Sequence, residues 1–283
     1  MKAFPQYKNK DYIFWANVKF ISEKLGYSDR KTNWPKIYDQ NEIVACFSKY
    51  KLNKTYIFDE RKLKLTEEGK NILDYLNKRS DLMSIYFLPN LMTREQAKKE
   101  FETLKIRIDP KCHLPLNKQK KEKRHHAFLS CIINMLTEEV LGGVYFDDNP
   151  TKLTVLTKSD KPIWVFSRRF DGAYPQIIDP IAVWEIKEYY GTTTFGSRVA
   201  DGIYETVLDG MEICSLIDKT KRNVYHYLII DDKYTWWDLG KSYLCRIIDI
   251  LNQGYIDEII VGRDVIKRWP EIVKSWIDLP SSK

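Results

Sequence analysis

The sequence predicts an α/β fold in which helices flank a mixed central sheet, with a small helical domain in front of it. Two features of the chain predict this fold. From Arg124 onward, short apolar runs of strand length alternate with longer runs at helical spacing, which is the pattern of a sheet covered by helices. The segment before Arg124 carries helical runs and one short hairpin, but no series of strands.

Length and composition limit the class of protein. The chain has 283 residues, of which 43% are hydrophobic, so it can bury the core of one large domain or of two modest ones. It has no run of about 18 apolar residues and no basic-then-apolar leader, so we expect neither a membrane span nor a signal peptide. The five cysteines are scattered, without a CxxC pair, which favours reduced thiols over disulfides or a zinc site. We therefore expect a cytoplasmic protein with no membrane partner.

The N-terminal elements follow from apolar spacing and from capping residues. Residues 12–25 have apolar side chains at helical spacing and stop at Gly26, a natural C-terminal cap. A second helix is expected over 41–50 and a β-hairpin over 55–65. Thr66 then caps a helix that begins EEGKNILDYLNKR, with two glutamates in its first turn.

A further helix and a basic segment complete the first part of the chain. Thr93 and Gln96 fit a capping box, so a helix is expected to begin there. Residues 111–126 then hold six Lys or Arg side chains and one acid, Glu122, which gives a net charge of +5. Such a segment suits a polyanion or an ordinary solvated linker. Its place before the candidate catalytic region slightly favours nucleic acid.

The chain thus divides into a helical domain over 1–110, a basic linker over 111–123 and a larger domain over 124–283. In the larger domain, helices are expected over 126–141, 197–217 and 241–251. Strands are expected over 153–156, 163–166, 170–174, 181–187, 224–230 and 256–261. This order of elements predicts the mixed sheet flanked by helices.

Three polar side chains near strand ends form the candidate site. Asp171 lies in one apolar run, and Glu185 and Lys187 end the next, where they share one face while Ile186 points to the other. Residues 181–184 are apolar on both faces, as in a central strand, where a charge needs a partner or a metal. Carboxylates beside a lysine can hold Mg²⁺ next to a phosphate. An Asp in a turn and a solvated Glu-x-Lys edge are the alternative interpretation.

These residues resemble the motif of the PD-(D/E)xK nuclease superfamily, and within it the type II restriction endonucleases. The resemblance covers residues 124–261 and rests on the order of elements, on Asp171, and on Glu185-Ile186-Lys187 after 13 intervening residues. The family core is a helix, a three-strand meander, a helix and a strand, with an acid on the second strand and acid-x-lysine on the third. Phe170 stands where the motif has a proline, its most variable position. Asp179 is a rival for the first acid, but it lies on the approach to the strand of Glu185 itself.

The resemblance implies a restriction-endonuclease-like core and a Mg²⁺-dependent, sequence-specific endodeoxyribonuclease that cuts double-stranded DNA to 5′-phosphate ends. Asp171, Glu185 and the Ile186 carbonyl would bind one or two Mg²⁺ ions, and Lys187 would orient the attacking water and help to deprotonate it. Family members often add an acid from the preceding helix, which would be Glu138 or Glu139 here. The implied partners are a second copy of the chain on DNA and a functionally paired DNA methyltransferase, in a prokaryotic cytoplasm.

Two segments are candidate DNA contacts. The sequence GTTTFGSR opens the long helix after the candidate strand, and its hydroxyls, backbone N–H groups and arginine suit a phosphate. Its candidate residues are Thr193, Thr194, Ser197 and Arg198. The basic linker adds Lys118, Lys120, Lys121, Lys123 and Arg124. An ordinary capped loop and a solvated linker are the alternatives.

The order helix, helix, hairpin, helix over residues 11–79, with the phrase KLKLTEEGKNILDYL, resembles winged-helix modules. Winged helices read DNA or contact proteins, so the first domain is expected to be a winged-helix-like, DNA-contacting domain or a small dock for the other domain. Two further functions remain open. One is a repair, resolvase or transposon nuclease of the same fold, and the other is a non-catalytic winged-helix DNA-binding protein.

Overall fold

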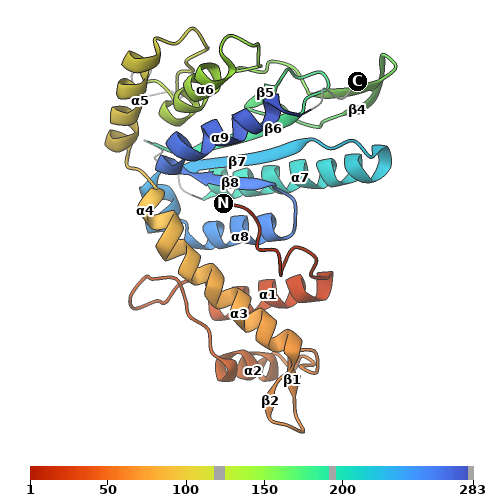
Figure 1. Cartoon of the computed structure of the whole chain (residues 1–283). Helices are drawn as coiled ribbons and strands as arrows, with labels where there is room; N and C mark the ends of the chain where they lie inside the picture. Colours follow the sequence, from red (N-terminus) through yellow and green to blue (C-terminus); the bar gives the residue numbers. More distant parts are fainter. Residues whose placement is uncertain (118–124, 191–195, 280–283) are drawn as a thin grey trace.

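The computed structural model describes residues 1–117, 125–190 and 196–279. It has a helical N-terminal part and a larger α/β part (Figure 1). The N-terminal part contains α1 (Tyr12–Leu25), α2 (Gln40–Lys49), the short strands β1 (Phe58–Asp59) and β2 (Lys64–Leu65), and α3 (Glu67–Leu82). The two strands pair antiparallel, so the predicted hairpin is present but shorter than expected.

Capping side chains fix where the N-terminal helices begin. Asp11, Asp39 and Thr66 each accept a backbone N–H from the first turn of α1, α2 and α3. The start of α3 also packs closely on the hairpin, because a Cβ at Gly69 would lie 2.0 Å from the Ile57 carbonyl oxygen. Only a glycine allows this approach, which explains the glycine of the LTEEG phrase.

The two parts are joined by helical segments. α3 continues into a π-helical stretch, Met83–Phe87, and into the short α4 (Leu88–Asn90) (Figure 1). α5 (Arg94–Ile108) then begins with the predicted capping box, in which Thr93 and Gln96 bond to each other's backbone. Although the sequence analysis groups α5 with the first domain, its apolar side chains share a core cluster with α6 (Phe128–Leu141).

The central sheet is mixed, as predicted, and has the strand order β5-β6-β7-β8. β5 (Gly172–Tyr174) is antiparallel to β6 (Ala182–Glu188), while β7 (Tyr225–Asp231) and β8 (Glu258–Val261) continue parallel to β6. An antiparallel bridge between Asp147 and Ala173 extends the sheet on the other side of β5. β3 (Val155–Lys158) and β4 (Lys161–Val165) pair with each other in a separate hairpin, and Val155 also forms an isolated parallel bridge with Ile178, so the predicted strands 153–156 and 163–166 do not join the main ladder.

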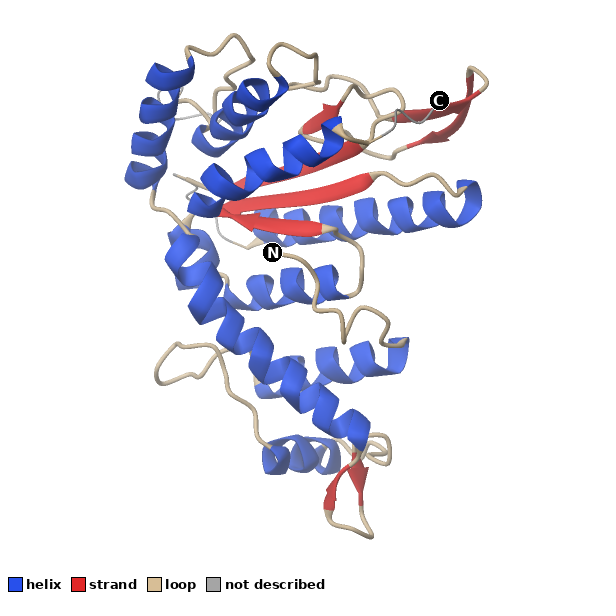
Figure 2. Ribbon diagram, viewed as in Figure 1, coloured by secondary structure: helices blue, strands red, loops and turns tan. Residues whose placement is uncertain are grey.

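Helices cover both faces of this sheet (Figures 1 and 2). α6 and α9 (Val265–Ile277) lie on one face, and α7 (Ser197–Thr220) and α8 (Lys241–Asn252) on the other. Trp184 of β6 is buried against Trp269 and Trp276 of α9, with ring centroids less than 6 Å apart. α9 has no counterpart among the helices expected from the sequence. Within the described part of the chain, no helix is both long enough and apolar enough to cross a membrane.

Candidate active site

Asp171 and Glu185 are brought together by the register of two strands. Gly172 lies opposite Trp184, and the Asp171 N–H donates to the Trp184 carbonyl at 3.0 Å. One residue further on, the same register places Asp171 beside Glu185. Asp171 Oδ2 accepts the N–H of Ile186 at 2.7 Å, which fixes the carboxylate at the strand edge. The structure therefore joins the two acids that the sequence analysis selects.

Lys187 follows on the same face of β6, and its ammonium lies between two glutamates. The Nζ atom is 2.9 Å from Glu185 Oε2 and 2.6 Å from Glu205 Oε2 on α7. α7 comes this close because residue 202 is glycine: a Cβ at Gly202 would lie 2.8 Å from the Tyr189 hydroxyl and 3.5 Å from Lys187 Cδ. Burial alone would lower the pKa of Lys187, but Glu185 and the neighbouring carboxylates raise it, so the side chain stays protonated.

A second cation, Arg168, completes the cluster. Its Nη1 atom is 2.9 Å from Glu185 Oε1 and 2.7 Å from Asp209 Oδ2, and its Nη2 atom is 3.1 Å from Glu205 Oε2. Arg168 thus ties the loop before β5 to the face of β6 that carries Glu185 and Lys187, and to α7. Its side chain is about one quarter exposed, whereas those of Glu185 and Asp209 are almost fully buried.

Arg168, Glu205 and Asp209 were not selected from the sequence. One signal for Asp209 was present: it occupies a buried position in the apolar stripe of α7, where a carboxylate needs a partner. No comparable signal marks Glu205, which is only partly buried, or Arg168, which lies in a loop. Their convergence depends on how α7 packs on the sheet, which local sequence pattern does not specify.

The cluster carries more negative than positive charge. Four carboxylates, on Asp171, Glu185, Glu205 and Asp209, face two cations, which leaves a formal charge of −2. Desolvation and the charge of Glu185 raise the pKa values of Asp171 and Asp209 to about 7, and the neighbouring cations only partly oppose this. Asp171 keeps exposed surface, so the cluster is open to solvent on that side.

The donor set suits a hard divalent cation. Glu185 Oε1 and Asp209 Oδ1 are buried oxygens without a hydrogen-bond donor, although the Glu185 oxygen lies beside Arg168. Within residues 1–117, 125–190 and 196–279, no three acidic, histidine or cysteine side chains converge on one point, so a complete protein cage is absent there. Mg²⁺ needs no such cage, because it is commonly held by one or two carboxylates, waters and a substrate phosphate. Asp171 and Glu185 fit that role.

Other selected residues lie away from this cluster. Glu138, in the last turn of α6, accepts the backbone N–H of Lys111 at 3.0 and 3.1 Å, and no contact joins it to Asp171 or Glu185 among the described residues. Asp179 accepts from the Thr157 N–H and hydroxyl and pairs with Arg222 at 2.7 Å. These contacts hold the β3–β4 hairpin. Glu138 is therefore not the additional acid of this site, and Asp179 is not its first acid.

The candidate DNA contacts are described only in part. Ser197 and Arg198 lie exposed in the first turn of α7, as predicted, and the Arg198 guanidinium lies 5.9 Å from the centre of the Tyr189 ring. Seven other candidates lie outside the described residues: Thr193, Thr194, Lys118, Lys120, Lys121, Lys123 and Arg124.

A second pair of acids lies on the opposite face of the sheet. Glu188 and Asp231 occupy the same row of β6 and β7, and burial raises their pKa values to about 8 and about 7. Glu188 accepts the Leu129 N–H at 2.7 Å, at the start of α6, and Asp231 accepts the Met92 N–H at 2.7 Å. Both therefore anchor backbone segments to the sheet.

Family models divide the chain where the two structural parts meet. One model, described as Domain of unknown function (DUF7687), matches residues 92–276, which is more than half of the chain. The chain belongs to the DUF7687 family. A second model, Domain of unknown function (DUF7690), matches residues 1–85. The DUF7687 match includes α5, in agreement with its packing on α6, and contains the whole candidate site. No curated protein and no solved structure matches the chain.

Proposed function

We propose that this protein is a Mg²⁺-dependent endodeoxyribonuclease of the PD-(D/E)xK superfamily that cuts double-stranded DNA at specific sequences, as type II restriction enzymes do. The observation that carries the proposal is the pairing of Asp171 with Glu185 across the register of β5 and β6, with Lys187 two residues further on the same face. An acid on one strand and acid-x-lysine on its neighbour is the arrangement that the motif requires.

The order of elements supports the same assignment. α6 precedes a bridge at Asp147, then β5 and β6, and these form a meander that is followed by α7 and the parallel strand β7. This corresponds to helix, three strands, helix, strand, with Asp171 at the second strand and Glu185 on the third. The bridge at Asp147 stands before β5 in this meander, where the strands 153–156 and 163–166 were expected from the sequence.

The residues have distinct roles in the proposed hydrolysis. Asp171 and Glu185 would hold Mg²⁺, which supplies charge neutralisation at the scissile phosphate and a more acidic bound water. Lys187 keeps its proton, so it acts as a hydrogen-bond donor that orients the attacking water and not as the base that deprotonates it. Glu205 holds the Lys187 ammonium in place at 2.6 Å. Because Asp171 is exposed, the phosphate would approach from its side of the cluster.

The N-terminal part would contribute DNA contacts as a winged-helix-like module. Its elements follow the order helix, helix, hairpin, helix. The outer face of α2 exposes the small or polar side chains of Asn41, Ala45 and Ser48, and Lys49 and Lys51 are exposed at its C-terminal end. Uncharged side chains on an exposed helix flanked by lysines suit base edges and phosphates respectively. A repair, resolvase or transposon nuclease would use the same centre on DNA structures.

One observation favours a second candidate function, a non-catalytic DNA-binding protein. Arg168 places a permanent positive charge 2.9 Å from Glu185 Oε1, where a metal ion would otherwise interact with this oxygen. If Arg168 stays in this position when DNA is bound, Glu185 is neutralised internally and the sheet domain is a scaffold.

Digestion of a sequenced plasmid with Mg²⁺ or with a chelator tests the proposal. We expect discrete fragments with Mg²⁺ only, because a sequence-specific nuclease cuts at fixed positions. Asp171→Asn should abolish cutting, since it removes a charged ligand while keeping the side-chain shape. Asp179→Asn is the matched control, because Asp179 pairs with Arg222 and should leave cutting intact. A smear would indicate a nuclease without sequence preference, and no cutting by the intact protein would favour the DNA-binding alternative.

A further inference from the structure

A cavity of about 600 Å³ lies between the N-terminal helices and the sheet domain. Its walls are α1 with the residues just after it, α7, α8 and the turn that follows α8. The volume is within the range of small-molecule sites, about 300 to 1,000 Å³. Asp171, Glu185 and Lys187 do not line it, so it is separate from the proposed nuclease centre.

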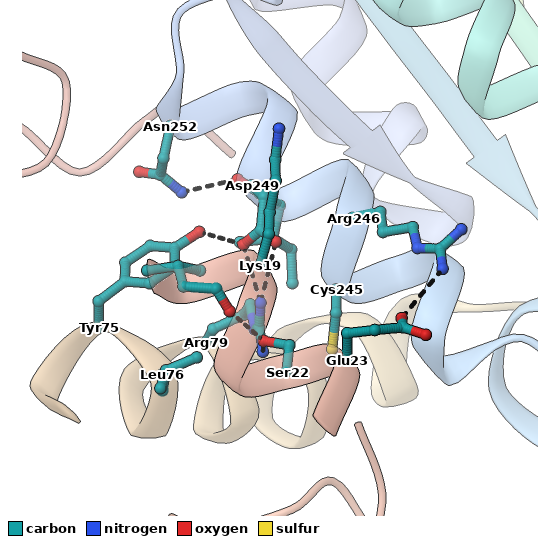
Figure 3. Close-up of polar contacts among 12 residues, drawn as sticks. Lys19, Ser22, Glu23, Tyr75, Leu76, Arg79, Cys245, Arg246, Asp249 and Asn252 are labelled. Atoms are coloured by element: carbon teal, nitrogen blue, oxygen red, sulfur yellow. Dashed lines mark hydrogen bonds and ion pairs between the residues drawn. The ribbon is translucent and has the colours of Figure 1, made fainter. Parts of the chain in front are cut away.

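Buried polar contacts hold the walls of this cavity at fixed positions (Figure 3). Arg79 on α3 contacts both oxygens of Asp249 on α8, at 3.0 and 2.9 Å, and donates to Ser22 on α1 at 2.9 Å. The Tyr75 hydroxyl donates to Asp249 at 2.6 Å. Because the buried Arg79 side chain joins α3 to Asp249 on α8 through Nη1 and to Ser22 on α1 through Nη2, the walls are held in place before any ligand binds.

The body of the cavity is apolar. It is lined by Phe20 on α1, by Ile203, Val207 and Met211 on α7, and by Ile250 on α8. Met211 and Tyr204, both on α7, are more than half exposed, although they line this concave surface. Aliphatic and aromatic walls of this kind favour a ligand with a flat apolar body.

The rim of the cavity is positively charged. Lys19, Lys24 and Arg246 line it, and within the described residues neither lysine has a carboxylate within 4.0 Å. Lys19 donates to Gln253 at 3.4 Å. The rim acid Glu23 lies 3.9 Å from Arg246, as Figure 3 shows. The other lining acid is neutralised by Arg79, so the rim has unbalanced positive charge.

We propose that this cavity is a binding site for a small organic anion with an aromatic body, such as an aryl carboxylate, an aryl sulfonate or the base and phosphate of a nucleotide. The apolar walls would cover the body, and Lys19 and Lys24 would pair with the anionic group. Such a ligand would touch the N-terminal part and α7 at once. The proposal stands whether or not the chain cuts DNA, because it uses none of the residues of that centre.

Fluorescence titration of the full chain with 8-anilinonaphthalene-1-sulfonate tests this proposal, because the probe combines a flat apolar body with one negative charge. We expect one saturable site. Met211→Glu places a carboxylate at the cavity wall and should weaken probe binding by about tenfold or more, since like charges repel strongly at short range. Leu208→Glu is the matched control, because Leu208 is similarly exposed on α7 but does not line the cavity.

The anionic group is tested separately with N-phenyl-1-naphthylamine, which has the same body and no charge. The double variant Lys19→Gln, Lys24→Gln should weaken sulfonate binding by about tenfold and leave binding of the neutral probe within about twofold. Equal effects of Met211→Glu and Leu208→Glu would overturn the site. Unchanged sulfonate binding by the lysine variant would overturn its preference for anions. Thermal unfolding of each variant verifies that it is folded.

Discussion

Arg168 offsets part of the negative charge that the candidate site offers to a metal ion. Its guanidinium contacts Glu185, Glu205 and Asp209 at 2.7 to 3.1 Å, so it supplies positive charge to these carboxylates. A metal ion that binds Glu185 must compete with this charge. The cluster still has two carboxylates in excess of its cations, and desolvation together with the charge of Glu185 raises the pKa values of Asp171 and Asp209.

Arg168→Gln should therefore strengthen divalent-cation binding. Removing the cation next to Glu185 removes a competing charge, and we expect Ca²⁺ to bind about tenfold more tightly in isothermal titration calorimetry. Arg169→Gln is the matched control, since Arg169 is exposed and contacts only the Thr151 carbonyl, at 3.4 Å, among the described residues. If Arg168→Gln binds Ca²⁺ no better than Arg169→Gln does, Arg168 is not a competitor of the metal.

At this scale the sequence predicts part of the site. Glu185 and Lys187 could be found because strand alternation is a local rule and the run before them is apolar on both faces. Asp171 could be found because it immediately precedes β5, the strand that comes directly before the strand of Glu185 in the chain, and consecutive strands commonly pair. Glu205 and Arg168 could not be found, because they reach Lys187 and Glu185 through tertiary packing, which has no local signature.

Among the elements, the helices and the central strands follow closely from the sequence, and errors arise where pairing partners must be chosen. The strands expected at 153–156 and 163–166 are present, but they pair with each other and not with the main sheet. The bridge at Asp147 lies beside β5 in their place. Glu138 was expected at the site because it lies in the helix before the meander. It is Glu188 that contacts this helix from the sheet, at Leu129 in its first turn, nine residues away from Glu138.

The contact of α3 with the hairpin gives a stability prediction for the N-terminal part. Gly69→Ala would place a Cβ 2.0 Å from the Ile57 carbonyl oxygen, which is backbone and cannot move easily. We expect a loss of about 1 to 3 kcal/mol in unfolding free energy, despite the better helix propensity of alanine. Urea denaturation checks this, with the exposed neighbour Lys70→Ala as control. A Gly69→Ala protein as stable as the control would show that the approach of α3 is looser than described.

For the whole molecule, the buried ion pair between Arg79 and Asp249 links the two parts. Asp249→Asn leaves the Arg79 charge buried with weaker partners and should cost about 3 to 5 kcal/mol in unfolding free energy. The double variant Arg79→Met, Asp249→Leu removes both charges and should be more stable than the single variant. Urea denaturation of both proteins measures the difference, and a single variant no less stable than the double variant would contradict the role of the pair.

The carboxyls with raised pKa values predict how stability depends on pH. The pKa values of Asp171, Asp209 and Asp231 rise to about 7, and that of Glu188 to about 8. A carboxyl with a raised pKa binds its proton more tightly in the folded state. Its contribution to the unfolding free energy is therefore present at low pH and is lost as the pH rises through the folded pKa. The lowered pKa values of His126 and His226 act in the opposite direction, but these groups are fewer.

Without metal, the unfolding free energy should therefore fall by about 2 kcal/mol or more between pH 5 and pH 8. Urea denaturation in the presence of a chelator measures this. Saturating Mg²⁺ should reduce the loss, because it compensates the charges of Asp171 and Glu185. A stability that rises over this interval in the absence of metal would show that these carboxyls are ionised at little cost.

The most direct test of the central claim, that Asp171, Glu185 and Lys187 form a nuclease centre, is cleavage by Lys187→Met. This change keeps the length of the side chain and removes the donor that orients the water. We expect Mg²⁺-dependent cleavage to fall by about a hundredfold or more, while DNA binding in Ca²⁺ stays within about threefold of the unchanged protein. Lys98→Met, on the exposed face of α5, should cut normally. Substantial Mg²⁺-dependent cutting by Lys187→Met would contradict the assignment.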